Sequence, residues 1–117
     1  MNGIAIGPDG GERLAGTTRG HRVLCELPEV EAIELCFGPE FEGVDPHTHA
    51  DHADCFYVLD GFAEFSLDGA TLSFGPGSFV AAPIGTVHGF RNAGEGDLRM
   101  LNFHAPTTGF VQSLRRD

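Results

Sequence analysis

The chain has 117 residues, of which 41% are hydrophobic and 21% are charged, a composition typical of one soluble globular domain. Its 17 acidic residues outnumber its 7 basic residues, and the net charge of −10 disfavours nucleic acid and anionic membranes as partners. No apolar run approaches the roughly 20 residues that a membrane-spanning helix needs. The N-terminus lacks the features of an export signal and the three cysteines form no CxxC pair, so we expect a cytoplasmic protein with reduced thiols.

The 17 glycines and 7 prolines separate short apolar runs, which is typical of an all-β chain. Residues 1–20 are expected to form a flexible arm with a short strand at Ile4–Ile6, ahead of a single domain at 21–117. The strands expected in that domain are Val23–Leu27, Glu31–Phe37, Cys55–Leu59, Phe62–Leu67, Ala70–Phe74, Ser78–Ala82, Val87–Arg91 and Leu98–His104. After Pro106, Thr107 or Thr108 is expected to cap a short helix that ends near Arg115, with Phe110, Val111 and Leu114 as its apolar face.

Turn sequences lie between these strands. Asp60-Gly61 and Asp68-Gly69 are strong hairpin signals, and residues 94–97 are expected to form the last hairpin loop. Ile33, Leu35 and Phe37 alternate along one strand and are expected to share a buried face. Short strands at this spacing predict a β-sandwich or barrel.

Four histidines fall within 42 residues, at positions 47, 49, 52 and 88. His47 and His49 are two residues apart, so on a strand both rings project from one face. Asp54 breaks that alternation, but a turn or bulge at 50–53 would return it to the same side. Phe56 and Val58 would then also face inward, while Cys55, Tyr57 and Leu59 would face away.

His88 follows a tight bend at Pro83-x-Gly85, which can aim its side chain into the mouth of a barrel. Three imidazoles and one carboxylate form a donor set that suits one Fe(II), Mn(II), Ni(II) or Zn(II) ion and leaves coordination positions open. Open positions allow substrate, water or dioxygen to coordinate.

The two histidine segments resemble the motifs of the cupin superfamily, G-x5-H-x-H-x3–4-E-x6-G and G-x5-P-x-G-x2-H-x3-N. The second motif is complete, with Gly77, Pro83, Gly85, His88 and Asn92 in their places. The resemblance covers about residues 38–106 and implies a double-stranded β-helix, or jelly-roll barrel, that holds a metal through His47, His49, Asp54 and His88.

The first motif departs from the family pattern at two positions. Phe41 stands where the first glycine is expected, with Gly43 two positions later, and Asp54 replaces glutamate as the acidic ligand. Because aspartate is one methylene shorter, either the strand moves inward, a water bridges the gap, or His52 takes the place of Asp54.

Other polar and aromatic residues are candidates for the site. His52 is a candidate acid or base at the pocket rim. Phe56 and Phe90 are expected to line the pocket, and Asn102 and His104 to orient a substrate if their strand face points inward. His104 at the surface end of the strand is the alternative for that residue. His21 is expected to be exposed, and Arg91 and Arg99 are either substrate-carboxylate ligands or, more simply, solvated or ion-paired.

The resemblance implies several functions, because cupins include enzymes, storage proteins and sensors. One hypothesis is a metal-dependent enzyme that acts on a small organic molecule, as a dioxygenase with a redox-active metal or as an isomerase or lyase with Zn(II) or Ni(II). The alternative is a non-catalytic module that binds a metabolite or metal. The family also implies a homodimer, for which an outer face bearing Tyr57 and Leu59 would suit an interface.

Overall fold

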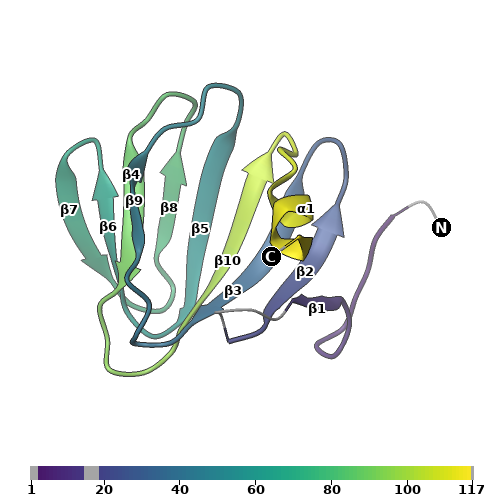
Figure 1. Ribbon diagram of the computed structural model, residues 1–117, viewed down its shortest axis with the longest axis horizontal. Helices are drawn as coiled ribbons and strands as arrows, with labels where there is room; N and C mark the ends of the chain where they lie inside the picture. Colours follow the sequence, from purple (N-terminus) through teal and green to yellow (C-terminus); the bar gives the residue numbers. More distant parts are fainter. Residues whose placement is uncertain (1–2, 15–18, 117) are drawn as a thin grey trace.

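The structure, a computed structural model, describes residues 3–14 and 19–116, which form two antiparallel sheets and one short helix (Figure 1). The larger sheet has the strand order β1 (Glu12–Leu14), β2 (His21–Glu26), β3 (Glu31–Phe37), β10 (Leu98–Ala105), β5 (Ala53–Asp60) and β8 (Phe79–Ala82). The smaller sheet has the order β4 (Val44–His47), β9 (His88–Asn92), β6 (Ala63–Leu67) and β7 (Ala70–Phe74). The helix α1 spans Phe110–Arg115. The predicted all-β jelly-roll with a short C-terminal helix is therefore confirmed.

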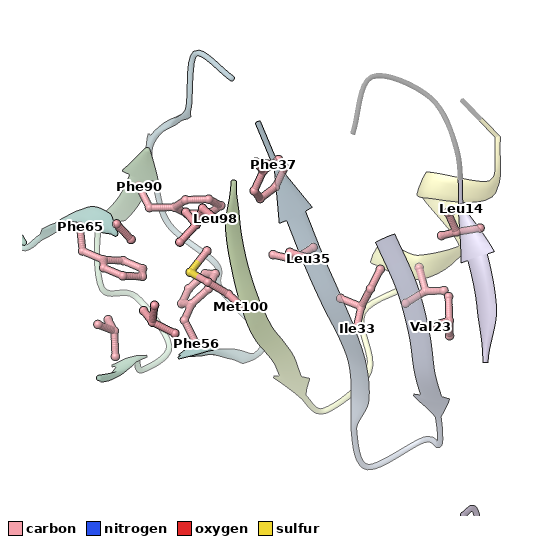
Figure 2. Close-up of a cluster of buried hydrophobic side chains, with 14 residues drawn as sticks. Leu14, Val23, Ile33, Leu35, Phe37, Phe56, Phe65, Phe90, Leu98 and Met100 are labelled. Carbon is pink, nitrogen blue, oxygen red and sulfur yellow. The ribbon is translucent and has the colours of Figure 1, made fainter. Parts of the chain in front are cut away.

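The hydrophobic core lies between the two sheets (Figure 2). Phe65 and Phe90 of the smaller sheet pack against Phe56 of the larger one, with ring centroids 5.3 Å from Phe56 in both cases. Strand alternation supplies the rest of this layer, because every second residue of β3, including Ile33 and Leu35, is buried. Aromatic rings in such offset contacts fill the volume of a small barrel with few side chains.

Strand β5 alternates in burial as predicted from Phe56 to Leu59, but Cys55, which was expected to face away with Tyr57 and Leu59, is buried. Phe56 and Val58 are buried, whereas Tyr57 and Leu59 are exposed on the outer face of the sheet. Phe79 of the edge strand β8, which pairs with Tyr57, is also exposed. The homodimer stays a prediction. Light scattering would test it by measuring the molar mass of the protein in solution.

Two of the three predicted hairpins are wrong. Asp68 and Gly69 have positive φ values of 49° and 84° and join the paired strands β6 and β7, as a tight hairpin turn requires. Asp60-Gly61 instead leads from β5 in the larger sheet to β6 in the smaller one, and residues 94–97 lead from β9 back to β10. These turns connect the two sheets, so the chain encloses a barrel.

The two ends of the described chain also differ from expectation. Ile4–Ile6 forms no strand, and the first strand is β1, which pairs with β2 although it falls within the segment expected to be an arm. Residues 1–2 and 15–18 of that segment lie outside the described residues. The helix cap is Gly109, with φ 91°, whereas Thr108 accepts a hydrogen bond at its Oγ1 from the N–H of Phe110.

Helix α1 packs beside β1 and β2 at one end of the larger sheet (Figure 1). Arg115 at its C-terminal end forms ion pairs with Glu12 of β1 (2.6 Å) and Glu26 of β2 (2.5 Å). Val111 is fully buried against the core. In the described part of the chain, no helix has the length and apolar character needed to cross a membrane.

Candidate metal centre

Strands β4 and β9 bring the two histidine motifs together. His47 pairs in register with His88, and their ring centroids are 4.5 Å apart. His49 lies just beyond β4, where its carbonyl accepts the N–H of Gly85 at 2.8 Å. The tight bend predicted ahead of His88 thus also holds the segment that carries His49.

Two glycines permit this close approach of the strands. At Gly89 a Cβ atom would lie 2.5 Å from the carbonyl oxygen of Val44. At Gly43, which has φ 102°, a Cβ atom would lie 2.8 Å from the carbonyl oxygen of Phe90. Gly43 is therefore needed where it stands, two positions after the place that the family motif gives to its first glycine.

Asp54, near the start of β5, turns inward as predicted and is buried (4% exposed). Its Oδ2 lies 2.9 Å from Nε2 of His88 and 3.5 Å from Nε2 of His49. The shorter aspartate side chain therefore reaches the imidazoles directly.

The orientation of two rings is fixed by the backbone. His47 donates its Nδ1–H to the carbonyl of Asp45, and His88 donates its Nδ1–H to the carbonyl of Thr86, each at 2.9 Å. In each ring the Nε2 atom is left to face the centre of the cluster. Histidines that bind metals in proteins are held in this way by their second nitrogen.

The four side chains fit a single metal ion. The ligand atoms of His47, His49, Asp54 and His88 all lie within 4.8 Å of one another. Bonds of about 2.0–2.2 Å to one ion place its donor atoms about 3 to 4.4 Å apart. The four donor atoms would therefore need to move only slightly closer together to bind the same ion. Three imidazole nitrogens and one carboxylate oxygen suit Fe(II), Mn(II), Ni(II) or Zn(II), and the identity of the ion does not follow from these distances.

Electrostatics favour the metal-binding forms of Asp54 and His49 and oppose that of His88. Burial would raise the pKa of Asp54, but hydrogen bonds from His104, His88 and Asn102 outweigh it and hold that pKa far below its usual range. Burial lowers the pKa of His49, which stays neutral near pH 7. The hydrogen bond to Asp54 raises the pKa of His88, so a metal competes with a proton for this ring.

Asn102 and His104 of β10 share one strand face, as their parity predicted, and the structure turns that face inward, so both are buried and the surface alternative for His104 does not hold. Asn102 donates from Nδ2 to Oδ1 of Asp54 at 2.7 Å and to the carbonyl of Cys55 at 3.0 Å. Nε2 of His104 lies 3.2 Å from the same Oδ1. Their substrate-binding role stays a prediction, because their polar contacts go to other groups of the protein, Asp54 among them.

His52 lies beside the four candidate ligands. Its ring centroid is 4.0 Å from that of His49, and its Nδ1–H donates to the exposed carboxylate of Asp51 at 2.7 Å. His52 is buried and lines the cavity described next. Its role as an acid or base stays a prediction.

A cavity of about 790 Å³ adjoins the donors, and His47, His49 and Asp54 line it. Phe56 and Phe90 line it as predicted. Further apolar walls come from Leu14, Leu35, Phe37, Phe41, Val44, Phe110 and Leu114. No arginine or lysine is among the described residues around this cavity, whose volume suits a small organic molecule.

The arginines considered as substrate ligands are ion-paired instead. Arg91 forms a two-pronged pair with Glu64 at 2.9 and 3.0 Å, and Arg99 lies 3.4 Å from Glu34. Neither lines the cavity.

His21 was expected to be exposed, and this prediction is wrong. It is 3% exposed, lines the cavity, and packs edge-on against Phe37. Its Nδ1 accepts the N–H of Cys36 at 3.0 Å, so the ring is neutral and carries its proton on Nε2. Burial lowers the pKa of His21 from 6.5 to about 4.

Neutral His21 makes the stability of the protein depend on pH. Below pH 6.5 the unfolded chain takes up a proton that the folded chain binds only near pH 4, so this contribution is present above pH 6.5 and lost as the pH falls. We expect the contribution of His21 to the free energy of unfolding to fall by about 2 kcal/mol between pH 7.5 and pH 5. His21→Asn keeps an acceptor for the N–H of Cys36 but cannot titrate, and urea unfolding at each pH measures the difference between the two proteins. Parallel pH profiles would contradict the assignment.

Comparison with known proteins identifies the family. A family model of the cupin domain matches residues 34–104, so the chain belongs to the cupin family. The quercetin 2,3-dioxygenase of Bacillus subtilis (strain 168) is 29% identical over 84 residues, which make up 69% of this chain and 25% of that protein. An uncharacterized protein of Aquifex aeolicus (strain VF5) is 40% identical over 70 residues, 60% of this chain and 57% of that protein. The chain therefore spans from a quarter to little more than half of these relatives.

Solved structures share the fold over more of the chain. KdgF from a Halomonas species superposes with a TM-score of 0.72 at 26% identity, covering 79% of this chain and 82% of that one. An RmlC-like cupin from Shewanella frigidimarina has a TM-score of 0.76 at 18% identity, covering 95% and 96% of the two chains. The second likeness supports the fold alone.

Proposed function

We propose that the protein is a mononuclear metal-dependent enzyme that acts on a small, uncharged, largely aromatic molecule. The carrying observation is that His47, His49, Asp54 and His88 direct their donor atoms to one point beside a cavity with mainly apolar walls. In this proposal these four residues hold one divalent ion.

The cavity supports the substrate class. A carboxylate or phosphate would meet no arginine or lysine among the described lining residues, and the sequence contains no lysine at all. Phe37 and Phe41 stack at a centroid distance of 3.9 Å, and Phe90 lies 5.7 Å from Phe37. Such walls favour a flat ring system through dispersion and offset stacking.

Dioxygenase-like chemistry is the reaction class that we favour, because the relative in Bacillus subtilis is a quercetin 2,3-dioxygenase. When bound, a redox-active ion would supply the electron-transfer chemistry that reactions with dioxygen need, whereas Zn(II) or Ni(II) would supply Lewis acidity for an isomerase or lyase. His52 is the candidate acid or base. Since Asp51 engages its Nδ1–H, Nε2 is the atom that would exchange a proton with a substrate hydroxyl.

An oxygen-uptake assay tests this function. Protein loaded separately with Fe(II), Mn(II), Ni(II) and Zn(II) would be given quercetin, a simple catechol, and a carboxylated aromatic of similar size as the anionic control. We expect uptake with a redox-active ion and an uncharged substrate, and its loss in His47→Ala. Absence of uptake with every pair would contradict the dioxygenase. Tight binding of the aromatics without turnover would favour the alternative of a non-catalytic binding module.

A further inference from the structure

Glu31 is the most deeply buried carboxylate among the described residues, at 1% exposure. It lies on β3 in register with His104 of β10. Strand alternation places Glu31 on the same inward face as Ile33 and Leu35, but it does not show what surrounds a carboxylate there. A buried carboxylate is costly unless several donors surround it.

Three donors at the start of the C-terminal helix meet this carboxylate. Its Oε2 accepts from the N–H and the hydroxyl of Thr108, both at 2.7 Å, and its Oε1 accepts from the N–H of Val111 at 3.2 Å. These contacts explain how Glu31 fixes α1. A fourth contact of Glu31 is made to strand β10 and not to the segment that begins α1.

The fourth contact joins Glu31 to the candidate metal centre. Nδ1 of His104 lies 3.2 Å from Oε2 of Glu31, and Nε2 of the same ring lies 3.2 Å from Oδ1 of Asp54. The imidazole therefore bridges two buried carboxylates. Its two nitrogens are held at opposite ends, so the ring cannot turn without breaking one of these contacts.

The two carboxylate oxygens of Asp54 have different partners. Oδ1 is occupied by His104 and by Asn102 (2.7 Å), whereas Oδ2 faces His88 and His49. Asp54 is thereby held with a single oxygen toward the imidazoles.

We propose that Glu31 is a positioning residue for the metal centre, acting through His104 to hold Asp54 with only Oδ2 toward the ion. The proposal rests on the proposed metal site. It makes the start of α1 and the ligand geometry parts of one hydrogen-bonded chain, Thr108–Glu31–His104–Asp54. Outer partners of metal ligands commonly change metal affinity by about 10–100-fold.

Titration with Co(II), followed by its visible absorption and by competition with a chromogenic chelator, tests this role. We expect Glu31→Gln to weaken Co(II) binding by about 10–100-fold and to alter the absorption bands, because Asp54 is no longer fixed. Val111→Ala is the matched control. It destabilises the same helix from a fully buried position, but it removes only apolar atoms and keeps the backbone N–H that donates to Glu31, so we expect wild-type affinity and an unchanged spectrum.

His104→Gln, which breaks the bridge in the middle, keeps the test decisive if Glu31→Gln does not fold. We expect it to weaken Co(II) binding similarly, and the double variant to lose no more than His104→Gln alone. The proposal is overturned if Glu31→Gln, or His104→Gln in its place, binds Co(II) with wild-type affinity and spectrum. It is equally overturned if Val111→Ala shows the same loss. Failure of the wild type to bind Co(II) would instead overturn the metal site itself.

Discussion

Replacing Asp54 with alanine is expected to lower metal affinity by at least about 100-fold and the unfolding free energy of the metal-free protein by about 3–5 kcal/mol. The carboxylate is buried and accepts from His88 at 2.9 Å, from Asn102 at 2.7 Å and from His104 at 3.2 Å. Its removal leaves these polar groups buried without their shared acceptor. Chelator competition and chemical denaturation measure the two effects.

Two further variants make this result specific. Asp60→Ala removes an exposed carboxylate from the far end of the same strand together with its hydrogen bond from the N–H of Gly61 (3.0 Å), and we expect a loss of no more than about 1 kcal/mol and unchanged metal binding. His52→Ala separates the two candidates for the fourth ligand. If His52→Ala loses the metal while Asp54→Ala keeps it, His52 is the ligand and the account of Asp54 is wrong.

The second large effect is expected for Gly89→Ala, which adds one methyl group to the residue between His88 and Phe90. The new Cβ would lie 2.5 Å from the carbonyl oxygen of Val44 and 2.9 Å from the nitrogen of Pro46, and both are backbone atoms that cannot rotate away. Strand β4 must therefore separate from β9, its hydrogen-bonded neighbour in the described sheet. We expect a loss of about 2–4 kcal/mol, together with weaker metal binding because His47 moves with β4.

Gly96→Ala is the control for this substitution, because no atom lies within 4 Å of the position that its Cβ would take. Thermal unfolding and metal titration of both variants compare a crowded glycine with an open one. Equal behaviour of the two variants would show that β4 and β9 do not approach as closely as the structure has them.

The sequence predicted much of the fold and the candidate site because both depend on local patterns. Alternation along Glu31–Phe37 identified its inward face, and the structure bears this out. For Leu98–His104 alternation only grouped the residues that share a face, and the structure shows that this face points inward. The same reasoning returned Asp54 to the inside after the break at 50–53. Motif spacing then brought His47, His49 and His88 into one cluster.

What the sequence could not predict depends on contacts between distant segments. An Asp-Gly pair occurs both in the hairpin at Asp68-Gly69, where both residues have positive φ, and in the connection between sheets at Asp60-Gly61, where only the glycine does. Gly61 is needed there because its φ is 83° and because a Cβ at this position would lie 2.4 Å from the carbonyl oxygen of the distant Asp97. The donors that satisfy buried Glu31 are more than 70 residues away in the sequence. His21 lines an internal cavity, and strand periodicity does not reveal that cavity.

Elemental analysis of protein purified without added metal, beside His47→Ala and His88→Ala prepared identically, tests the central claim most directly. We expect about one divalent first-row ion per wild-type chain and only trace amounts in the two variants. Wild-type protein that stays metal-free even after incubation with Fe(II), Mn(II), Ni(II) and Zn(II), or variants that retain as much metal as the wild type, would contradict the claim.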